Sequence, residues 1–148
     1  MKIENKTILL VEDNSSDVEL TRRALLKEHI TNEIIVAEDG QEALDYMFGE
    51  GSYEGRDITQ QPSLILLDIN LPIVDGLEVL RRLRADPRTH RQLIVILTSS
   101  KEEQDLLKSY DLGVNSYIRK PVDFNQFAEA IKYLGIYWLV INEPPPSR

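Results

Sequence analysis

The chain has 148 residues, of which 42% are hydrophobic and 28% are charged, and its formal net charge at pH 7 is -8. This length and balance predict one globular domain with a core of ordinary size. The acidic charge argues against a nucleic-acid-binding surface, because neutralising phosphates needs clustered Lys and Arg. The sequence contains no cysteine, which excludes a disulfide framework and a thiolate metal site or nucleophile.

The first apolar segment of the chain, residues 7–11, is followed directly by the charged residues Glu12 and Asp13. It is far shorter than the apolar region of a signal peptide, or than the roughly 20 residues that a membrane span requires. We therefore expect a cytoplasmic protein that has no membrane partner.

Strand and helix patterns alternate along the sequence. In chain order, apolar runs predict strands at residues 7–11, 34–37, 64–67, 93–97 and 114–118. Each run is followed by apolar residues at helical spacing, which predicts helices at residues 16–29, 41–48, 76–84, 102–112 and 124–138. The first helix starts with Ser16 and Glu19 in the spacing of a capping box, and helix 102–112 is expected to place Leu106, Leu107 and Tyr110 on one apolar face.

Five strand–helix units in alternation predict an α/β fold, in which a doubly wound, five-stranded parallel sheet is covered by helices on both faces. The usual order of such a flavodoxin-like sheet is 2-1-3-4-5, with the ligand site at the carboxyl ends of strands 1 and 3. Residues 1–141 are expected to form this domain, with a long surface loop at 49–62 and an extended last helix. A Pro-rich tail follows at 142–148.

Chemically active side chains gather at the predicted carboxyl ends of the strands: Glu12 and Asp13 after strand 1, Asp68 after strand 3, Thr98 after strand 4 and Lys120 after strand 5. Each alone has an ordinary explanation, such as a helix cap, a strand end or a solvated charge. Three carboxylates in one crevice repel each other, however, and a divalent cation resolves that conflict. Ligands that are all oxygen favour a hard ion such as Mg²⁺. With Lys120 opposite, Asp68 could attack a phosphoryl group and form an acyl phosphate.

Four segments carry a family resemblance: "ILLVEDN", "LILLDINLPIVDGLEVL", "LIVILTSS" and "GVNSYIRKP". They resemble the signature segments of the response-regulator receiver domain, the module that a histidine kinase phosphorylates in two-component signalling. The resemblance covers nearly the whole chain. The longer loop at 49–62 and the extended last helix are similar to the single-domain response regulators that partner cyanobacterial phytochromes.

The resemblance implies a role for each matching position. Asp68 is the phosphoacceptor, Mg²⁺ is the cofactor, and a histidine kinase, expected to be of the phytochrome type, is the partner. The metal is held by Asp13, Asp68 and the main-chain carbonyl of Asn70, with Glu12 acting through water. Thr98 binds the phosphoryl group and Lys120 pairs with it. The Lys120–Pro121 bond is expected to be cis, which points the amine of Lys120 into the site. Tyr117 is the aromatic switch residue. No enzymatic activity is expected beyond the chain's own phosphorylation and dephosphorylation.

Other classes of protein share parts of this pattern. A phosphatase of the haloacid dehalogenase type also uses a strand-end Asp and Mg²⁺, but it needs a second Asp where this chain has Asn70. A phosphohistidine carrier needs a His on a helical bundle, and a flavodoxin-like cofactor protein needs a Ser, Thr and Gly loop after strand 1. An adaptor with a receiver fold and a silent site, which only docks a kinase, stays open.

The segment 133–141, "YLGIYWLVI", is apolar except for Gly135, whereas one buried helix face needs an apolar residue only every third or fourth position. Surplus apolar surface on such a domain usually marks a partner site. We therefore expect a homodimer through a dimer or partner surface made by Tyr133, Ile136, Tyr137 and Trp138.

Overall fold

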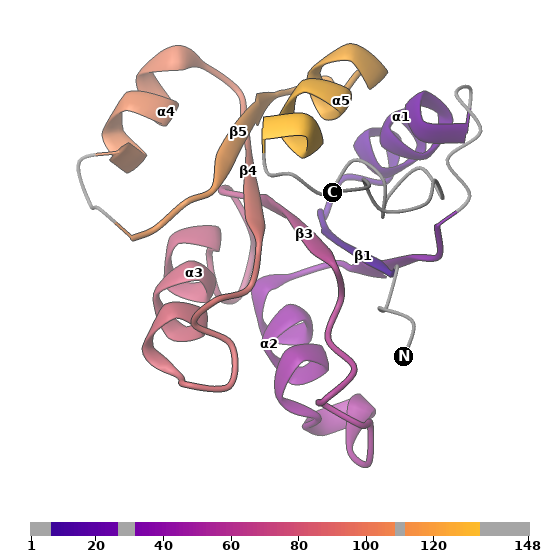
Figure 1. Ribbon diagram of the computed structural model, residues 1–148, viewed down its shortest axis with the longest axis vertical. Coiled ribbons are helices and arrows are strands. Elements are labelled where there is room, and N and C mark those ends of the chain that lie inside the picture. The colour runs from indigo at the N-terminus through magenta and orange to yellow at the C-terminus, as the bar shows by residue number, and fades with distance from the viewer. Residues whose placement is uncertain (1–6, 27–31, 109–111, 134–148) are drawn as a thin grey trace, which may run out of the picture.

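The computed structural model describes residues 7–26, 32–108 and 112–133, and its centre is one parallel sheet (Figure 1). The strands are β1 (Ile8–Val11), β2 (Ile34–Ala37), β3 (Leu64–Asp68), β4 (Ile94–Thr98) and β5 (Ser116–Arg119). All pair in parallel, in the order β2-β1-β3-β4-β5, which confirms the predicted fold class and strand order. Every residue of β1, β3 and β4 is buried, because helices cover both faces of these strands.

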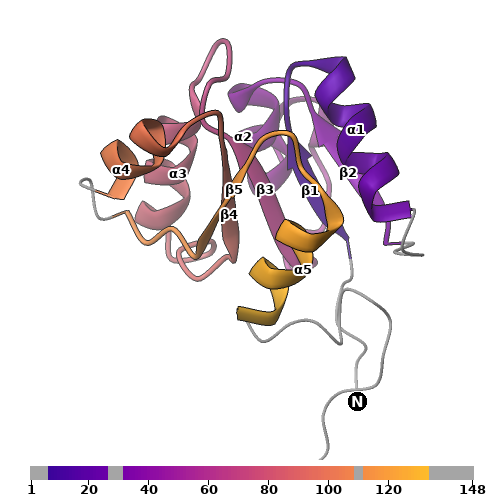
Figure 2. The same ribbon diagram turned by 90° about the horizontal axis from the view of Figure 1, so that it is seen from above.

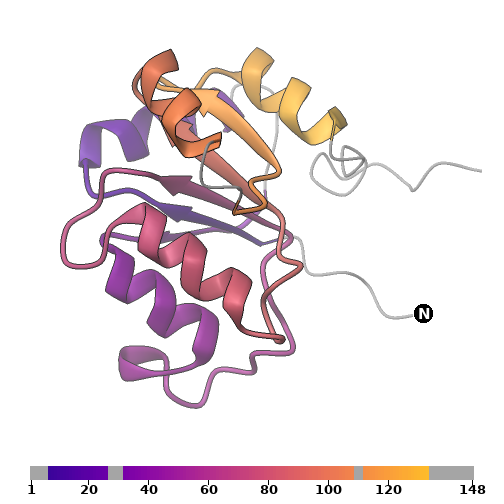
Figure 3. The same ribbon diagram turned by 90° about the vertical axis from the view of Figure 1, so that its left-hand side faces the viewer.

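Five helices enclose the sheet: α1 (Ser15–Leu26), α2 (Gly40–Phe48), α3 (Gly76–Ala85), α4 (Lys101–Lys108) and α5 (Phe124–Tyr133). Turning the molecule shows α1 and α5 on one side of the sheet and α2 and α3 on the other (Figures 2 and 3). The buried side chain of α4, Leu107, packs into the same layer as α2 and α3.

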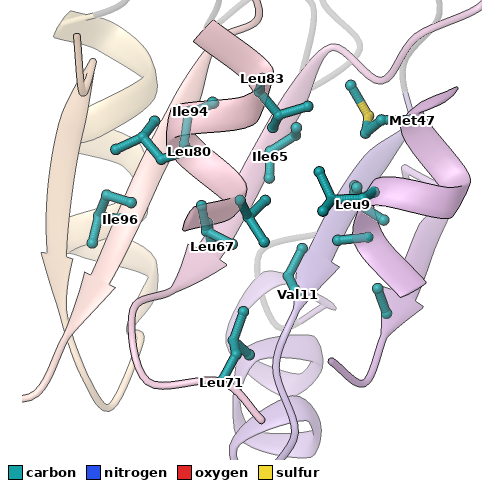
Figure 4. Packing of buried hydrophobic residues seen from close by; sticks show 14 of the residues in the cluster. Leu9, Val11, Met47, Ile65, Leu67, Leu71, Leu80, Leu83, Ile94 and Ile96 are labelled. Atoms are coloured by element: carbon teal, nitrogen blue, oxygen red, sulfur yellow. The ribbon is translucent and has the colours of Figure 1, made fainter. Parts of the chain in front are cut away.

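The core has two layers, because alternate residues of each strand point to opposite faces of the sheet. Leu9, Ile65 and Ile96 pack toward α2 and α3, where Met47 and Leu80 meet them (Figure 4). The other layer joins the alternate strand residues to Leu25 of α1 and Phe127 of α5, both fully buried. The continuous apolar runs of the sequence are therefore explained by burial on both faces.

The start of α1 differs from the expected capping box at Ser16. The cap is Asn14, whose Oδ1 accepts a hydrogen bond from the backbone N–H of Asp17 at 3.0 Å. Glu19 pairs with Arg23 one turn further on instead of reaching back to the helix start. The expected capping box is therefore wrong, because three consecutive residues could have capped the helix and the first of them does.

Two further expectations concern α4 and the segment 49–62. Leu107 of α4 is buried as predicted, but Leu106 is 59% exposed, so its place on the apolar face is wrong. Tyr110 lies outside the described residues. The segment 49–62 contains a short 3-10 helix, η1 (Gly51–Tyr53). Residues 134–148, which include the expected end of the domain and its tail, also lie outside the described residues.

The segment 49–62 is fastened to α2 by Arg56. Its Nε donates a hydrogen bond to the main-chain oxygen of Tyr46 at 2.6 Å, and its guanidinium carbon lies 3.9 Å from the centre of the Tyr46 ring. Tyr53 packs edge-on against the same ring and donates a hydrogen bond to Glu42 at 2.9 Å. These contacts give a segment that reads as a plain loop in sequence a defined structure.

Candidate functional site

The register of the sheet places two acids side by side. Val11 of β1 pairs with Leu67 of β3, so the residues that follow, Glu12 and Asp68, lie together at the carboxyl edge. Glu12 is 1% exposed and Asp68 is 3% exposed. Asp13 is exposed, yet one carboxylate oxygen from each of the three residues lies within 4.8 Å of the others.

Lys120, the residue directly after β5, reaches this acidic group. Its backbone N–H donates to the main-chain oxygen of Thr98 at 2.8 Å, which fixes the strand end beside β4, and the Lys120–Pro121 bond is cis as expected. Its Nζ lies 3.0 Å from a carboxylate oxygen of Glu12 and 3.1 Å from one of Asp68. The structure thus gathers the four charged residues of the predicted site.

Asp17 is a further member of the site that the sequence reasoning missed. Its Oδ2 lies 3.0 Å from Lys120 Nζ, and its position in the first turn of α1 follows from the cap at Asn14. The signal in the sequence was an acid one helical turn after the acidic pair. Its partner, Lys120, however, follows the last strand, more than a hundred positions later in the sequence, so only the folded chain shows the contact.

The charges of Glu12 and Lys120 depend on each other. Burial raises the pKa of Glu12 to about 7, its hydrogen bond from Lys120 acts to lower the pKa, and its contact with Asp68 raises it. Burial acts to lower the pKa of Lys120, but hydrogen bonds to Glu12, Asp17 and Asp68 outweigh it, and the net pKa is raised. Lys120 therefore stays protonated, whereas burial favours the neutral form of Glu12 and the contact with Lys120 favours its carboxylate.

The donor set fits a small hard cation. Its ligand atoms are carboxylate oxygens from Glu12, Asp13 and Asp68, close enough to share one ion. Such oxygen-only sites with one or two direct carboxylates favour Mg²⁺, which keeps several of its waters. A cation would also relieve the repulsion among these acids, so the residues present fit a Mg²⁺ site.

The loop between β3 and α3 approaches Asp68 closely. A Cβ on Gly76 would collide with the main-chain oxygen of Asp68 and lie 2.7 Å from the Cα of Ile69, so a glycine is needed here. Asn70 donates its backbone N–H to Asp68 Oδ1 at 3.1 Å, and its side chain donates to Glu103 of α4 at 2.8 Å. Glu103 is a second contact that the sequence reasoning missed, because there it reads as an ordinary acid of a helix.

Ile73 of the same loop has a left-handed backbone with φ of 68°, and it is 78% exposed. The backbone N–H of Val74 donates across it to the main-chain oxygen of Pro72 at 2.8 Å, which closes a tight γ-turn. A β-branched residue in this region of backbone space is an outlier. The loop beside Asp68 therefore carries local strain.

Thr98 and Tyr117 lie on neighbouring strands near the site. Thr98 is fully buried at the end of β4, and its Oγ1 has no hydrogen-bond partner among the residues that the structure describes. Tyr117 of β5 is half-buried, burial raises the pKa of its phenol, and Lys108 Nζ lies 5.6 Å from the centre of its ring. Of the expected dimer surface, Tyr133 is 81% exposed, and Ile136, Tyr137 and Trp138 lie outside the described residues.

Comparison with known proteins decides the family. The model of the response regulator receiver domain matches residues 8–132. The chain belongs to this family. Response regulator Rcp1 of Synechocystis sp. is 37% identical over 134 residues, which are 90% of this chain and 89% of Rcp1. Among the described helices of the receiver, none is both long and apolar enough to span a bilayer.

Solved receiver structures agree in fold and relate the chain to phytochrome response regulators. The bacteriophytochrome response regulator AtBRR is 52% identical, with a TM-score of 0.87 over 95% of this chain and 99% of AtBRR. The phosphorylated cyanobacterial phytochrome response regulator RcpA is 40% identical, with a TM-score of 0.72 over 97% of this chain and 99% of RcpA. A structure of Rcp1 contains Mn²⁺; it is 35% identical, with a TM-score of 0.72 over 96% of this chain and 99% of Rcp1.

Proposed function

We propose that this receiver accepts a phosphoryl group on Asp68 from a histidine kinase. The observation that carries the proposal is the position of Asp68, buried at the carboxyl end of β3, 3.1 Å from the amine of Lys120 and within 4.8 Å of two further carboxylates. A carboxylate held at a strand end between an amine and two further acids is placed to act as a nucleophile toward phosphorus.

The transfer is a simple displacement. A carboxylate oxygen of Asp68 attacks the phosphorus of the kinase phosphohistidine, a new P–O bond forms, and the bond from phosphorus to the imidazole nitrogen breaks. The imidazole leaves with the electron pair and takes its proton from water. Lys120 orients Asp68 and neutralises the charge on the phosphoryl oxygens as they approach.

In this proposal Mg²⁺ is held by Asp13, Asp68 and the main-chain carbonyl of Asn70, with Glu12 acting through water. When bound, the ion supplies positive charge for the phosphoryl oxygens. The remaining work is done by the chain. Glu12, which is buried and accepts a hydrogen bond from Lys120, keeps that amine aimed at Asp68.

The phosphorylated state is read through Thr98 and Tyr117. The hydroxyl of Thr98, which has no hydrogen-bond partner in the described part of the chain, is available to a phosphoryl oxygen on Asp68. Its movement toward that oxygen leaves space that Tyr117 fills by turning inward. The surface formed by α4, β5 and α5 then changes shape. The partner that detects the change binds the two states with different affinity.

Relatedness to phytochrome response regulators supports a phytochrome-type kinase as the donor. We place this transfer in the cytoplasm and propose no activity of the chain on other substrates. The exposure of Tyr133 supports a homodimer contact at this residue, and we propose that Ile136, Tyr137 and Trp138, which follow it in the sequence, belong to the same contact. Sedimentation over a range of concentrations tests this surface. A dimer that weakens when Tyr137 and Trp138 are changed to Ala is expected, and a wild type that is monomeric throughout would overturn it.

Intact mass spectrometry tests the phosphorylation site directly. The purified chain is incubated with Mg²⁺ and acetyl phosphate, and the wild type should gain one base-labile phosphoryl group. Asp68→Asn should gain none. Asp105→Asn, which removes the same charge from an exposed position of α4, should be labelled like the wild type. Equal labelling of Asp68→Asn would place the nucleophile elsewhere.

A further inference from the structure

Glu103, the third residue of α4, joins two loops at the edge of the site. Its Oε2 accepts a hydrogen bond from Asn70 Nδ2 at 2.8 Å, and its Oε1 accepts one from the backbone N–H of Ser99 at 2.9 Å. Asn70 follows β3 and Ser99 follows β4. One half-buried carboxylate therefore ties the ends of two neighbouring strands to the start of a helix.

Part of this arrangement is a helix cap. Ser100 Oγ accepts the backbone N–H of Glu103 at 3.2 Å, and a Glu at this place commonly reaches back to an N–H before the helix. Capping does not require the bond to Asn70, which spans 33 positions of sequence and belongs to the loop after β3. The hydrogen bond between Asn70 and Glu103 therefore needs a separate explanation.

The hydrogen bond between Asn70 and Glu103 connects α4 to Asp68 through a single residue, Asn70. Asn70 donates its backbone N–H to Asp68 Oδ1 at 3.1 Å while its side chain donates to Glu103. A phosphoryl group carries about -1.5 to -2 charge, and it disrupts contacts beside an acid through like-charge repulsion. We therefore expect phosphorylation of Asp68 to repel the carboxylate of Glu103 and to displace Asn70, which lies between them.

We propose that Glu103 is a latch, which holds the loop between β3 and α3 to the start of α4 while Asp68 is free and releases it when Asp68 carries a phosphoryl group. The inference rests on the proposed phosphorylation of Asp68. Glu103 is a positioning residue, because its carboxylate contacts Asn70 and Ser99 and acts on the site through them. Since latch release and phosphorylation are coupled, removing the latch favours the phosphorylated state.

Binding of beryllofluoride with Mg²⁺, a stable mimic of the phosphoryl group, measures that coupling. Glu103→Ala should bind it about five-fold more tightly than the wild type, the lower end of ordinary coupling between sites. Glu102→Ala is the matched control, since it removes an equal charge from an exposed neighbour on the same helical turn. Equal affinity of the Glu103→Ala and Glu102→Ala variants would overturn the latch.

The side-chain amide signal of Asn70 in nuclear magnetic resonance spectra reports the latch itself. In the wild type it should move on addition of beryllofluoride toward its position in ligand-free Glu103→Ala, and Glu102→Ala should behave like the wild type. The change Asn70→Ala should make a further Glu103→Ala substitution nearly silent in affinity, because both changes remove the same hydrogen bond between Asn70 and Glu103. Full additivity of the two changes, or an Asn70 signal that does not move, would refute the latch. A wild type that binds no beryllofluoride and gains no mass would instead refute phosphorylation at Asp68.

Discussion

Asp17 of α1 and Lys120, which follows β5, lie 3.0 Å apart, so the amine that faces Asp68 is shared with an acid from a helix. In the proposed phosphorylated state, the phosphoryl group on Asp68 competes with Asp17 for this amine. Lys120 also contacts Glu12 and Asp68, so it stays in place when Asp17 is lost.

The change Asp17→Asn should therefore speed phosphorylation by acetyl phosphate several-fold, because it removes a competing charge. The cost in the free energy of unfolding should be below about 1 kcal/mol, as for other partly exposed ion pairs. Rates are followed by intact mass. Glu19→Gln removes an equal charge from an exposed position of α1, and a rate equal to that of Asp17→Asn would contradict the competition.

Replacing Ile73 by Gly should stabilise the receiver. A left-handed backbone costs an L-residue about 1–2 kcal/mol, and glycine avoids that cost but loses part of the gain because its unfolded chain is freer. The net expectation is an increase of about 1 kcal/mol in the free energy of unfolding. Urea denaturation measures this increase, and the dependence of the free energy of unfolding on urea concentration should stay unchanged. Ile73→Val keeps both the branched side chain and the strain, so its stability should stay near that of the wild type.

Replacing Gly76 by Ala should disturb Asp68. The new Cβ meets backbone atoms of Asp68 and Ile69, which cannot move aside like a flexible side chain. We expect a loss of about 1–3 kcal/mol in the free energy of unfolding, as for other overpacked positions, together with slower phosphorylation. Gly55→Ala is the control, because a Cβ there meets nothing within 4 Å and only its backbone is strained. It should lose stability while phosphorylation stays normal.

Tyr53 should make stability depend on pH at high pH. Burial, followed by its hydrogen bond to Glu42, raises the pKa of its phenol to about 12, from about 10 in an unfolded chain. Because the folded pKa is the higher one, the contribution to stability is fully present below pH 10 and is lost as pH rises toward 12. Tyr53→Phe should flatten the fall in stability over this window. An identical pH dependence in both proteins would contradict it.

The fold was predictable because fully buried parallel strands leave continuous apolar runs, and the acids that end β1 and β3 come together in any sheet of this order. Asp17 and Glu103 were not predictable, since each acquires its role from a partner on a distant strand or loop. The start of α1 was misplaced because Asn14 is followed by two serines that could also cap a helix. The exposure of Leu106 depends on how α4 sits against the sheet, which helical periodicity alone does not determine.

The buried hydroxyl of Thr98 is expected to couple phosphorylation of Asp68 to the thermal stability of the receiver. Thr98 Oγ1 has no hydrogen-bond partner within residues 7–26, 32–108 and 112–133. A buried polar group left without a hydrogen bond lowers the free energy of unfolding by about 1–3 kcal/mol. An acceptor oxygen on Asp68 restores that bond only in the folded chain, so it shifts the balance between folded and unfolded molecules. If Asp68 is phosphorylated as proposed, the unphosphorylated receiver is the less stable of the two forms, and the share of a sample that melts at the higher temperature measures how much of it is phosphorylated.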